Sequence, residues 1–204
     1  GRFINEIVSV EIPQRKKDSI IFSEDEFIKD KTSIEILSKL RTAFKSENGT
    51  VTAGNASGLN DGSAAMLLAS EKGVKDNNLT PIARIVSSAV VGVEPSIMGI
   101  GPVLASNKAL EKVNLKMDDM DIIELNEAFS AQALACIREW GLEDNDPRIN
   151  PNGGAISLGH PLGVSGTRIL QTAAIELQNQ NKKYALVTMC IGVGQGYATI
   201  IEKV

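Results

Sequence analysis

The hydrophobic pattern of the chain becomes regular from Ile82 onward. Apolar runs of strand length there alternate with longer segments whose apolar residues recur at helical spacing. This alternation predicts a layered α/β sheet. The expected strands are 82–91, 122–125, 184–190 and 197–201, and the expected helices are 103–112, 127–140 and 167–178.

The part of the chain before Ile82 is less regular. A short strand is expected within 3–12, and apolar spacing predicts a helix within 33–45. The stretch 50–60 is rich in Gly, Ser, Thr and Asn, which is typical of a loop. Apolar residues lie nearly all round a helix drawn through 61–70, so we expect a buried helix there. A turn at 77–81 is a candidate domain boundary.

Composition narrows the class of protein. The chain is 43% hydrophobic, enough to form a core, and its net charge of −4 argues against a nucleic-acid surface. No apolar run approaches the roughly 20 residues that span a bilayer. Two cysteines without metal-ligand spacing predict neither a disulfide framework nor a zinc site, and they favour a reducing, cytoplasmic compartment. No signal-peptide pattern opens the chain, and its start at Gly1 without an initiator methionine is compatible with a fragment.

The one histidine, His160, lies in a glycine-rich turn. Segment 150–166 reads Asn-Pro-Asn-Gly-Gly-Ala-Ile-Ser-Leu-Gly-His-Pro-Leu-Gly-Val-Ser-Gly. Glycines let backbone approach a ligand closely, and an imidazole held at a helix entrance can exchange a proton near neutral pH. A histidine that only caps the following helix is the alternative, and the setting favours proton chemistry.

Cys190 ends an apolar strand and precedes glycines at 192, 194 and 196. It could be an inert buried thiol, or a thiolate base or nucleophile beside glycine N–H groups that form an oxyanion hole. A thiolate there would need surroundings that lower its pKa. Cys136 lies on the apolar stripe of the helix expected at 127–140 and is predicted to belong to the core.

Three further segments are ambiguous by themselves. Asn126 follows a short strand, where asparagine is favoured as a helix N-cap for structural reasons alone. The small side chains of 52–62 suit either a tight connection or a narrow ligand tunnel. The Gly-x-Gly within 98–102 is too weak to indicate nucleotide binding.

Taken in order along the chain, these segments resemble the signature blocks of the thiolases, the acetyl-CoA acetyltransferases and 3-ketoacyl-CoA thiolases. The matching blocks are Gly54–Gly62, Met98–Pro102, Asn126–Phe129, Asn152–Gly166 and Cys190–Gly196. The resemblance covers the whole chain and implies a thiolase-like layered α/β fold with a mixed sheet and helices on both faces.

The same resemblance implies a division of the chain into three parts. Residues 1–60 would be the tail of the loop domain, and 61–80 a helix that packs against a missing N-terminal half. Residues 81–204 would be the thiolase C-terminal domain. Without that half, Met66, Leu67 and Leu68 are expected to be exposed and to promote aggregation.

The resemblance implies an acyltransferase of acyl-CoA metabolism, such as that of fatty acids. Thiolases cleave a 3-ketoacyl-CoA with CoA or run the reverse Claisen condensation. His160 matches the histidine that activates the nucleophilic cysteine, and Asn126 the asparagine that fixes a water in the same oxyanion hole. Cys190 matches the acid/base cysteine and Gly192 a glycine whose N–H serves the other oxyanion hole. The residues matched to the pantetheine arm and acyl pocket are Ser57, Met98, Ala128 and Phe129.

The cysteine that carries the acyl group has no match among these 204 residues, because only Cys136 and Cys190 are present. We therefore expect half of a longer enzyme or a naturally short protein, inactive without an N-terminal thiolase half that carries the nucleophile. Acyl-CoA and CoA are the expected ligands, with CoA as substrate rather than cofactor, and no metal. The full enzyme is expected to be a homodimer or a dimer of dimers, soluble and without nucleic acid.

Three other interpretations compete with this one. A ketoacyl synthase-like condensing enzyme shares the fold but usually uses two histidines, whereas this chain has one. A non-catalytic CoA-binding or assembly subunit could retain the thiolase surface. A generic α/β domain would use the same residues only for structure.

Overall fold

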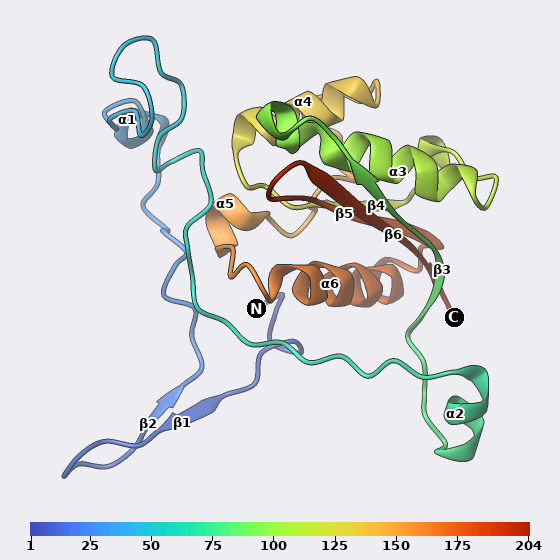
Figure 1. The fold of residues 1–204 in the computed structure, drawn as a ribbon. Helices are drawn as coiled ribbons and strands as arrows, with labels where there is room; N and C mark the ends of the chain where they lie inside the picture. Colours follow the sequence, from blue (N-terminus) through green and yellow to red (C-terminus); the bar gives the residue numbers. More distant parts are fainter.

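The apolar runs after Ile82 pair into one mixed sheet of four strands (Figure 1). The computed structural model describes residues 1–204. The order across the sheet is β3-β6-β5-β4; β4 runs parallel to β5, and the other neighbours are antiparallel. The strands are β3 (Ala83–Gly92), β4 (Ile122–Leu125), β5 (Tyr184–Ile191) and β6 (Gln195–Lys203). The four strands expected from the sequence are confirmed.

Helices cover both faces of this sheet, as the family resemblance implies. A larger core lies under α3 and α4, and a smaller one lies under α6 on the opposite face (Figure 1). Ile169, Ala173 and Leu177 recur every fourth residue on α6, which turns one apolar stripe toward the strands. The helical segments are η1 (Pro95–Ile100), α3 (Gly101–Glu111), η2 (Met117–Asp119), α4 (Ser130–Glu139), α5 (Ala155–Leu158) and α6 (Ser165–Gln180).

The continuous apolar run of β5 follows from its place in the sheet. Both of its edges are hydrogen-bonded, to β4 and to β6, and both of its faces are covered. Leu186 enters the core under α3 and α4, whereas Val187 enters the core under α6. A strand buried on both faces has no reason to alternate polar and apolar residues.

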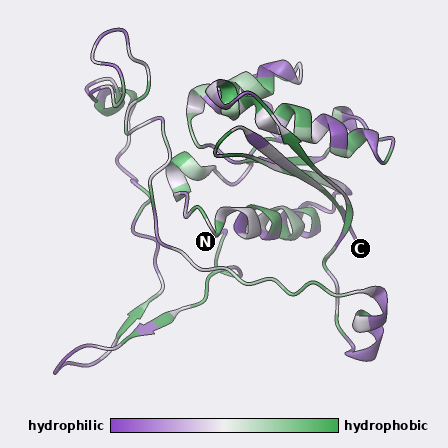
Figure 2. Ribbon diagram, viewed as in Figure 1, coloured by the Kyte–Doolittle hydropathy of each residue, from purple (hydrophilic) through white to green (hydrophobic).

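The part of the chain before the sheet forms long arms with little regular structure. Its elements are β1 (Val10–Ile12), β2 (Ile20–Phe22), α1 (Ile34–Leu37) and α2 (Glu71–Asp76). The predicted strand within 3–12 is reduced to β1, which pairs with β2 in a projecting antiparallel hairpin. Figure 2 shows the hydrophobic residues of this hairpin away from the body of the molecule. The helix predicted within 33–45 is a single turn, α1.

The helix predicted over 61–70 is wrong. The segment is extended, and helix starts only at α2, where the Ser70 hydroxyl accepts the Gly73 N–H at 3.1 Å. An apolar run suits a strand covered on both faces as well as a buried helix, and periodicity cannot separate them. Here the run passes below α6 (Figure 1), and its Leu67 and Leu68 are 74% and 67% exposed.

The α6 side of the sheet is only partly covered. A groove of about 850 Å³ lies between the extended segment, α6 and the strands β3 and β6. Apolar side chains that line it, among them Leu68 and Ile85, remain exposed. A sheet face of this kind is normally covered by another layer. None of the helices is both long and apolar enough to cross a membrane.

We expect the exposed leucines of this groove to drive self-association of the chain. Replacing Leu67 and Leu68 by serine removes apolar surface whose burial is worth roughly 2 kcal/mol per side chain. The double variant should show a larger monomer fraction in light scattering. Serine at Val8 and Ile34, which are 84% and 87% exposed on the arms, is the matched control. An equal rise of the monomer fraction in both double variants would show that the groove does not drive self-association.

Candidate active site

Asn126 and Cys190 lie at one edge of the sheet because β4 and β5 are parallel. Leu125 is in register with Thr188, and the Asn126 N–H donates to the Thr188 carbonyl at 3.0 Å. Cys190 is two residues further along β5 and is 6% exposed. The carboxyl ends of neighbouring parallel strands therefore present an amide and a thiol at the same edge.

The turn that carries His160 is fixed by the loop before residue 61. Leu59 forms a parallel bridge with His160, and the His160 N–H donates to the Asn60 side-chain oxygen at 3.1 Å. Gly159 has a φ of 90°, and a Cβ there would lie 2.6 Å from the Asn60 oxygen. Glycine is thus required at 159 on both counts.

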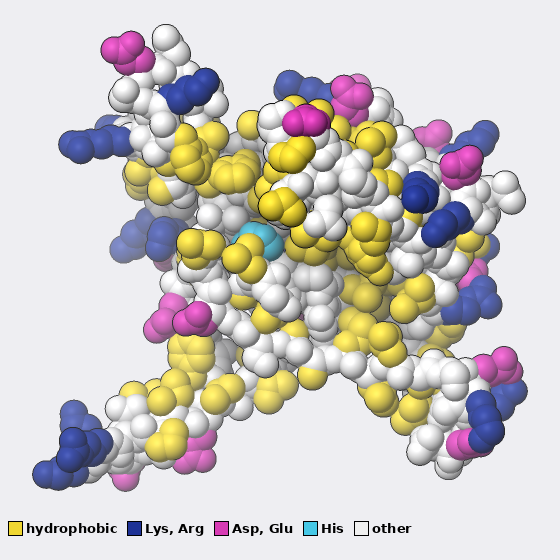
Figure 3. Space-filling model, in the orientation of Figure 1, with side chains coloured by type: hydrophobic (Ala, Val, Ile, Leu, Met, Phe, Trp, Pro, Cys, Tyr) yellow, Lys and Arg dark blue, Asp and Glu magenta, His cyan; other side chains and the backbone are white.

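The imidazole of His160 contacts Asn126 directly. Asn126 Nδ2 lies 3.3 Å from His160 Nε2, and Ser165 Oγ lies 2.5 Å from His160 Nδ1. His160 is 7% exposed, and Figure 3 shows it at the surface between hydrophobic side chains. The structure therefore brings together two of the predicted catalytic residues.

The hydrogen-bond pattern selects one tautomer of this histidine. The Ser165 hydroxyl donates to the Pro161 carbonyl at 3.2 Å, so its oxygen accepts the Nδ1–H of His160. Nε2 then carries a lone pair and accepts the Asn126 amide. Burial, with a smaller contribution from the Arg168 charge, lowers the pKa of His160. The imidazole is therefore a neutral base whose unprotonated nitrogen is Nε2.

A short ladder brings Ser57 to the predicted acyl-pocket residues. The Ser57 N–H donates to the Ala128 carbonyl at 3.0 Å, and Ala56 bridges Phe129. The Phe44 ring meets the Phe129 ring edge-on with centroids 6.1 Å apart. This ladder also explains why α4 starts at Ser130, three residues later than the predicted helix.

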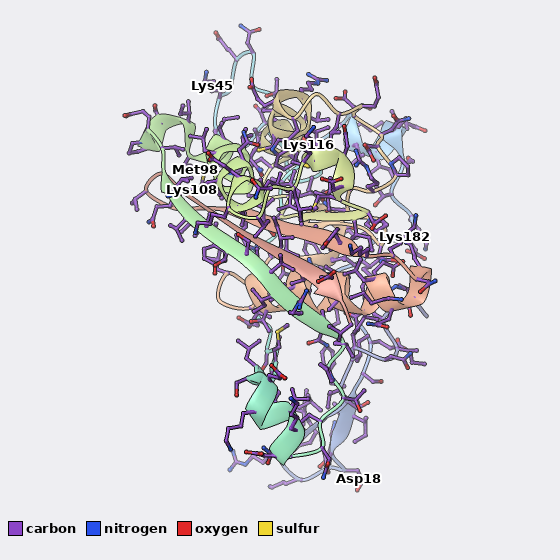
Figure 4. The ribbon with its side chains drawn as sticks, turned by 90° about the vertical axis from the view of Figure 1, so that its right-hand side faces the viewer. Asp18, Lys45, Met98, Lys108, Lys116 and Lys182 are labelled. Atoms are coloured by element: carbon purple, nitrogen blue, oxygen red, sulfur yellow. The ribbon has the colours of Figure 1, made fainter.

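Met98 belongs to the segment η1, which close contact between two backbones holds against the Cys190 end of β5. It lies on η1 beside α3 (Figure 4), and η1 leads into Gly101. A Cβ on Gly101 would lie 2.5 Å from the Gln195 carbonyl oxygen, and one on Gly196 would lie 2.1 Å from the Gly101 oxygen. Since Gly196 pairs with Cys190, these glycines set η1 against the end of β5.

The turn after Cys190 contains a strained residue that the sequence analysis missed. Ile191 pairs with Gln195, which leaves Gly192, Val193 and Gly194 to close the hairpin. Val193 has a φ of 59°, a left-handed conformation that is unusual for a β-branched residue. Gly192 is exposed here, so its N–H group is not enclosed by this chain alone.

Both cysteines rest as neutral thiols. Burial raises the pKa of Cys190, and burial raises the pKa of Cys136 to about 11. Cys136 is fully buried in the larger core, as predicted. The surroundings of Cys190 thus do the reverse of what a resting thiolate would need, and its thiol is suited to donate a proton.

Glu127 and Asn150 support the site and were not singled out by the sequence. The Asn150 side chain accepts the Leu125 N–H at 2.9 Å and donates to the Leu125 carbonyl at 2.8 Å. The Glu127 carboxylate accepts the Ile156 N–H at 3.2 Å and faces Gly154 so closely that a Cβ would clash. These contacts hold the loop before His160 against the end of β4.

Comparisons with known proteins place the chain among the thiolases. The thiolase C-terminal domain model matches residues 79–203, and the thiolase N-terminal domain model matches residues 1–72. The beta-ketoadipyl-CoA thiolase of Acinetobacter baylyi is 55% identical over 204 residues, which are 100% of this chain and 51% of that protein. The chain thus spans about half the length of the curated relatives that it matches.

Two solved structures are also similar over the whole chain. The acetyl-CoA acetyltransferase of Bacillus anthracis superposes with a TM-score of 0.95 at 44% identity, and the match covers 51% of that chain. Human mitochondrial 3-ketoacyl-CoA thiolase in complex with CoA gives a TM-score of 0.91 at 48% identity, over 50% of its length. Fold and sequence therefore define an α/β protein of the thiolase class, and the chain belongs to the thiolase family.

Substituting Ser165 by alanine should disturb the histidine without touching its unprotonated nitrogen. Loss of the Ser165 hydroxyl leaves Nδ1–H without its acceptor, so the other tautomer gains population. Because His160 is the one histidine, its ¹⁵N shifts report the change without overlap. Thr172→Ala, which removes another buried hydroxyl of α6, is the control. Unchanged shifts in Ser165→Ala would contradict the tautomer assignment.

Because of the buried carboxyl of Glu124, we expect the free energy of unfolding to fall at alkaline pH. Burial raises the pKa of this carboxyl to about 8, partly offset by the charge of Arg168. Between about pH 4.5 and pH 8 the folded state holds a proton on Glu124 that the unfolded state releases. The stability that depends on this proton is therefore fully present below about pH 4.5 and is lost as pH rises to about 8. The loss is up to roughly 4 kcal/mol.

The glutamine variant provides the comparison. Glu124→Gln should unfold at nearly the same temperature as the wild type near pH 5 and at a higher temperature near pH 9. Differential scanning calorimetry across that range measures the difference. Parallel curves for the two proteins would show that Glu124 is not a buried neutral acid.

Proposed function

We propose that this chain supplies the acid/base and oxyanion groups of an acyl-CoA C-acyltransferase. The nucleophilic cysteine would come from an N-terminal thiolase half. The observation that carries the proposal is the Asn126–His160–Ser165 network beside Cys190 at one sheet edge. The reaction is thiolytic cleavage of a 3-ketoacyl-CoA by CoA, or the reverse condensation.

His160 would act as the base toward the incoming nucleophile. Its Nδ1–H is held by Ser165, so Nε2 is the basic nitrogen and could take a thiol proton in place of the Asn126 amide hydrogen bond. Once protonated, the same nitrogen could donate to a thioester oxygen, and Asn126 could hold a water beside it. A preorganised donor of this kind typically contributes 10²–10³ in rate.

Cys190 would move the proton at the substrate α-carbon or on the leaving thiol. Its neutral thiol can donate in the direction that releases a product, and it must be deprotonated to act in the other direction. Gly192 lies two residues further on and would offer its N–H to the enolate oxygen. The Met98 segment would form the adjacent wall of the acyl pocket.

Coenzyme A would enter along the loop that holds His160. Ser57 pairs with Ala128 and could contact the pantetheine arm. The Phe27 ring packs at Gly58, and Lys29 Nζ lies 5.8 Å from the centre of that ring. A lysine at this end of the loop suits a CoA phosphate.

The relative from Acinetobacter baylyi is named for a 3-ketoacyl-CoA whose acyl chain ends in a second carboxylate. We extend that substrate class to this chain as part of the proposal. The free thiols favour a cytoplasmic setting. The open groove beside α6 favours docking of the N-terminal half, and the complete enzyme is proposed to be a homodimer or tetramer.

The alternative function is a catalytically incomplete CoA-binding or assembly subunit. It is favoured by the number of cysteines, because neither thiol is left to act as the nucleophile. Cys136 lies in the core and Cys190 at the proposed acid/base position. Such a subunit would bind CoA and an N-terminal half without turnover.

Activity of the chain with and without the N-terminal half of the Acinetobacter relative separates these functions. The chain alone should show no thiolysis of beta-ketoadipyl-CoA, and co-expression with that half should restore it. In the restored complex, His160→Ala and Cys190→Ala should each lower kcat by roughly 10²–10⁴. Cys136→Ala, the matched cysteine control, should retain most turnover. Full turnover by either site variant would contradict the assigned roles.

A further inference from the structure

Glu124 is a buried carboxyl that the chemistry proposed above does not use. It precedes Asn126 by two residues on β4, so both side chains stand on the same, α6-facing side of the strand. Glu124 is 1% exposed, and its Oε1 has no hydrogen-bond partner. A carboxylate without donors is costly in such a place, whereas the neutral acid is tolerated.

The facing side of α6 carries a polar row that starts at the histidine. Residues three or four apart share one side of a helix, which places Ser165, Arg168, Thr172 and Glu176 in line. Ser165 contacts His160, while Thr172 donates to Glu6 at 2.7 Å. Arg168 lies between them, and its Nε and Nη1 are shielded from solvent without a partner.

The other cation near this row already has carboxylate partners. Arg2 bonds Glu6 at 2.6 Å and Glu176 at 2.8 Å, which fastens the start of the chain to α6. Arg168 has no comparable ion pair. A guanidinium so placed acts on its neighbours with little cancellation.

We propose that Arg168 is a positioning residue for His160: its buried guanidinium, one helical turn from the Ser165 hydroxyl that holds Nδ1 and without a carboxylate partner, adds to the effect of burial in disfavouring a second proton on the imidazole. Arg168 acts on the ring without touching substrate. The importance for catalysis rests on the function proposed above, in which His160 is the base. The charge effect itself does not depend on that function.

The surrounding charges determine the direction in which the pKa values of Glu124 and His160 are shifted. The charged groups acting on Glu124 are Arg168 and Arg2, which favour its ionised form, and Glu6 and Glu127, which oppose it. Burial dominates and raises its pKa, so it stays neutral where His160 titrates. Burial and then the Arg168 charge lower the pKa of His160. Removing the Arg168 charge should therefore raise it.

The test is an NMR titration of His160 in the 204-residue chain, where no other histidine interferes. Arg168→Gln should shift the midpoint upward, and Arg168→Lys, which keeps the charge, should stay near the wild type. Arg168→Met keeps the aliphatic stem and is the second variant if glutamine prevents folding. Arg84→Gln removes a charge from an exposed residue of β3 and should leave the midpoint unchanged.

Glu124→Gln mimics the neutral acid and should also leave the His160 midpoint unchanged. An unshifted midpoint in both charge-removing variants at 168 overturns the proposal. A downward shift in Glu124→Gln also overturns it, because Glu124 would then be an ionised partner of Arg168. These outcomes are read without turnover, so failure of the proposed thiolase function would appear separately in the activity assay.

Discussion

The parallel pairing of β4 with β5 is the constraint on which the site depends. It places the end of β4, with Asn126, beside the end of β5, with Cys190. Antiparallel pairing would carry the two residues to opposite edges of the sheet. Since the loop before residue 61 and the turn before α6 both close on this edge, His160 meets Asn126 there.

The same sheet has one face that this chain covers only in part. One face carries a well-covered core, whereas the β3 and β6 part of the other face borders an open apolar groove. The extended run that passes below α6 leaves its leucines in solvent. In the proposed function, the N-terminal thiolase half would cover these surfaces and bring a nucleophile toward Nε2 of His160. Half-length coverage of the thiolase relatives is consistent with that requirement.

The sequence predicted the sheet well because its strands and helices lie within one part of the chain and form their own cores. It failed at 61–70, where the same apolar run suits a buried strand or a buried helix and the neighbours that decide lie elsewhere. The glycine-rich settings of His160 and Cys190 identified the candidate site residues. Ser165, Asn60 and Arg168 escaped notice, because their importance comes from contacts across the fold rather than from local pattern.

We propose that this chain works on an acyl group that another polypeptide carries. The most direct test of this proposal is intact mass spectrometry of the chain assembled with an N-terminal thiolase half, denatured after brief exposure to acetyl-CoA without acceptor. We predict that the mass of one acetyl group appears on the N-terminal half and that the 204-residue chain is unmodified. An acetyl group on this chain that is lost in Cys190→Ala would contradict the account, because Cys190 would then be the nucleophile.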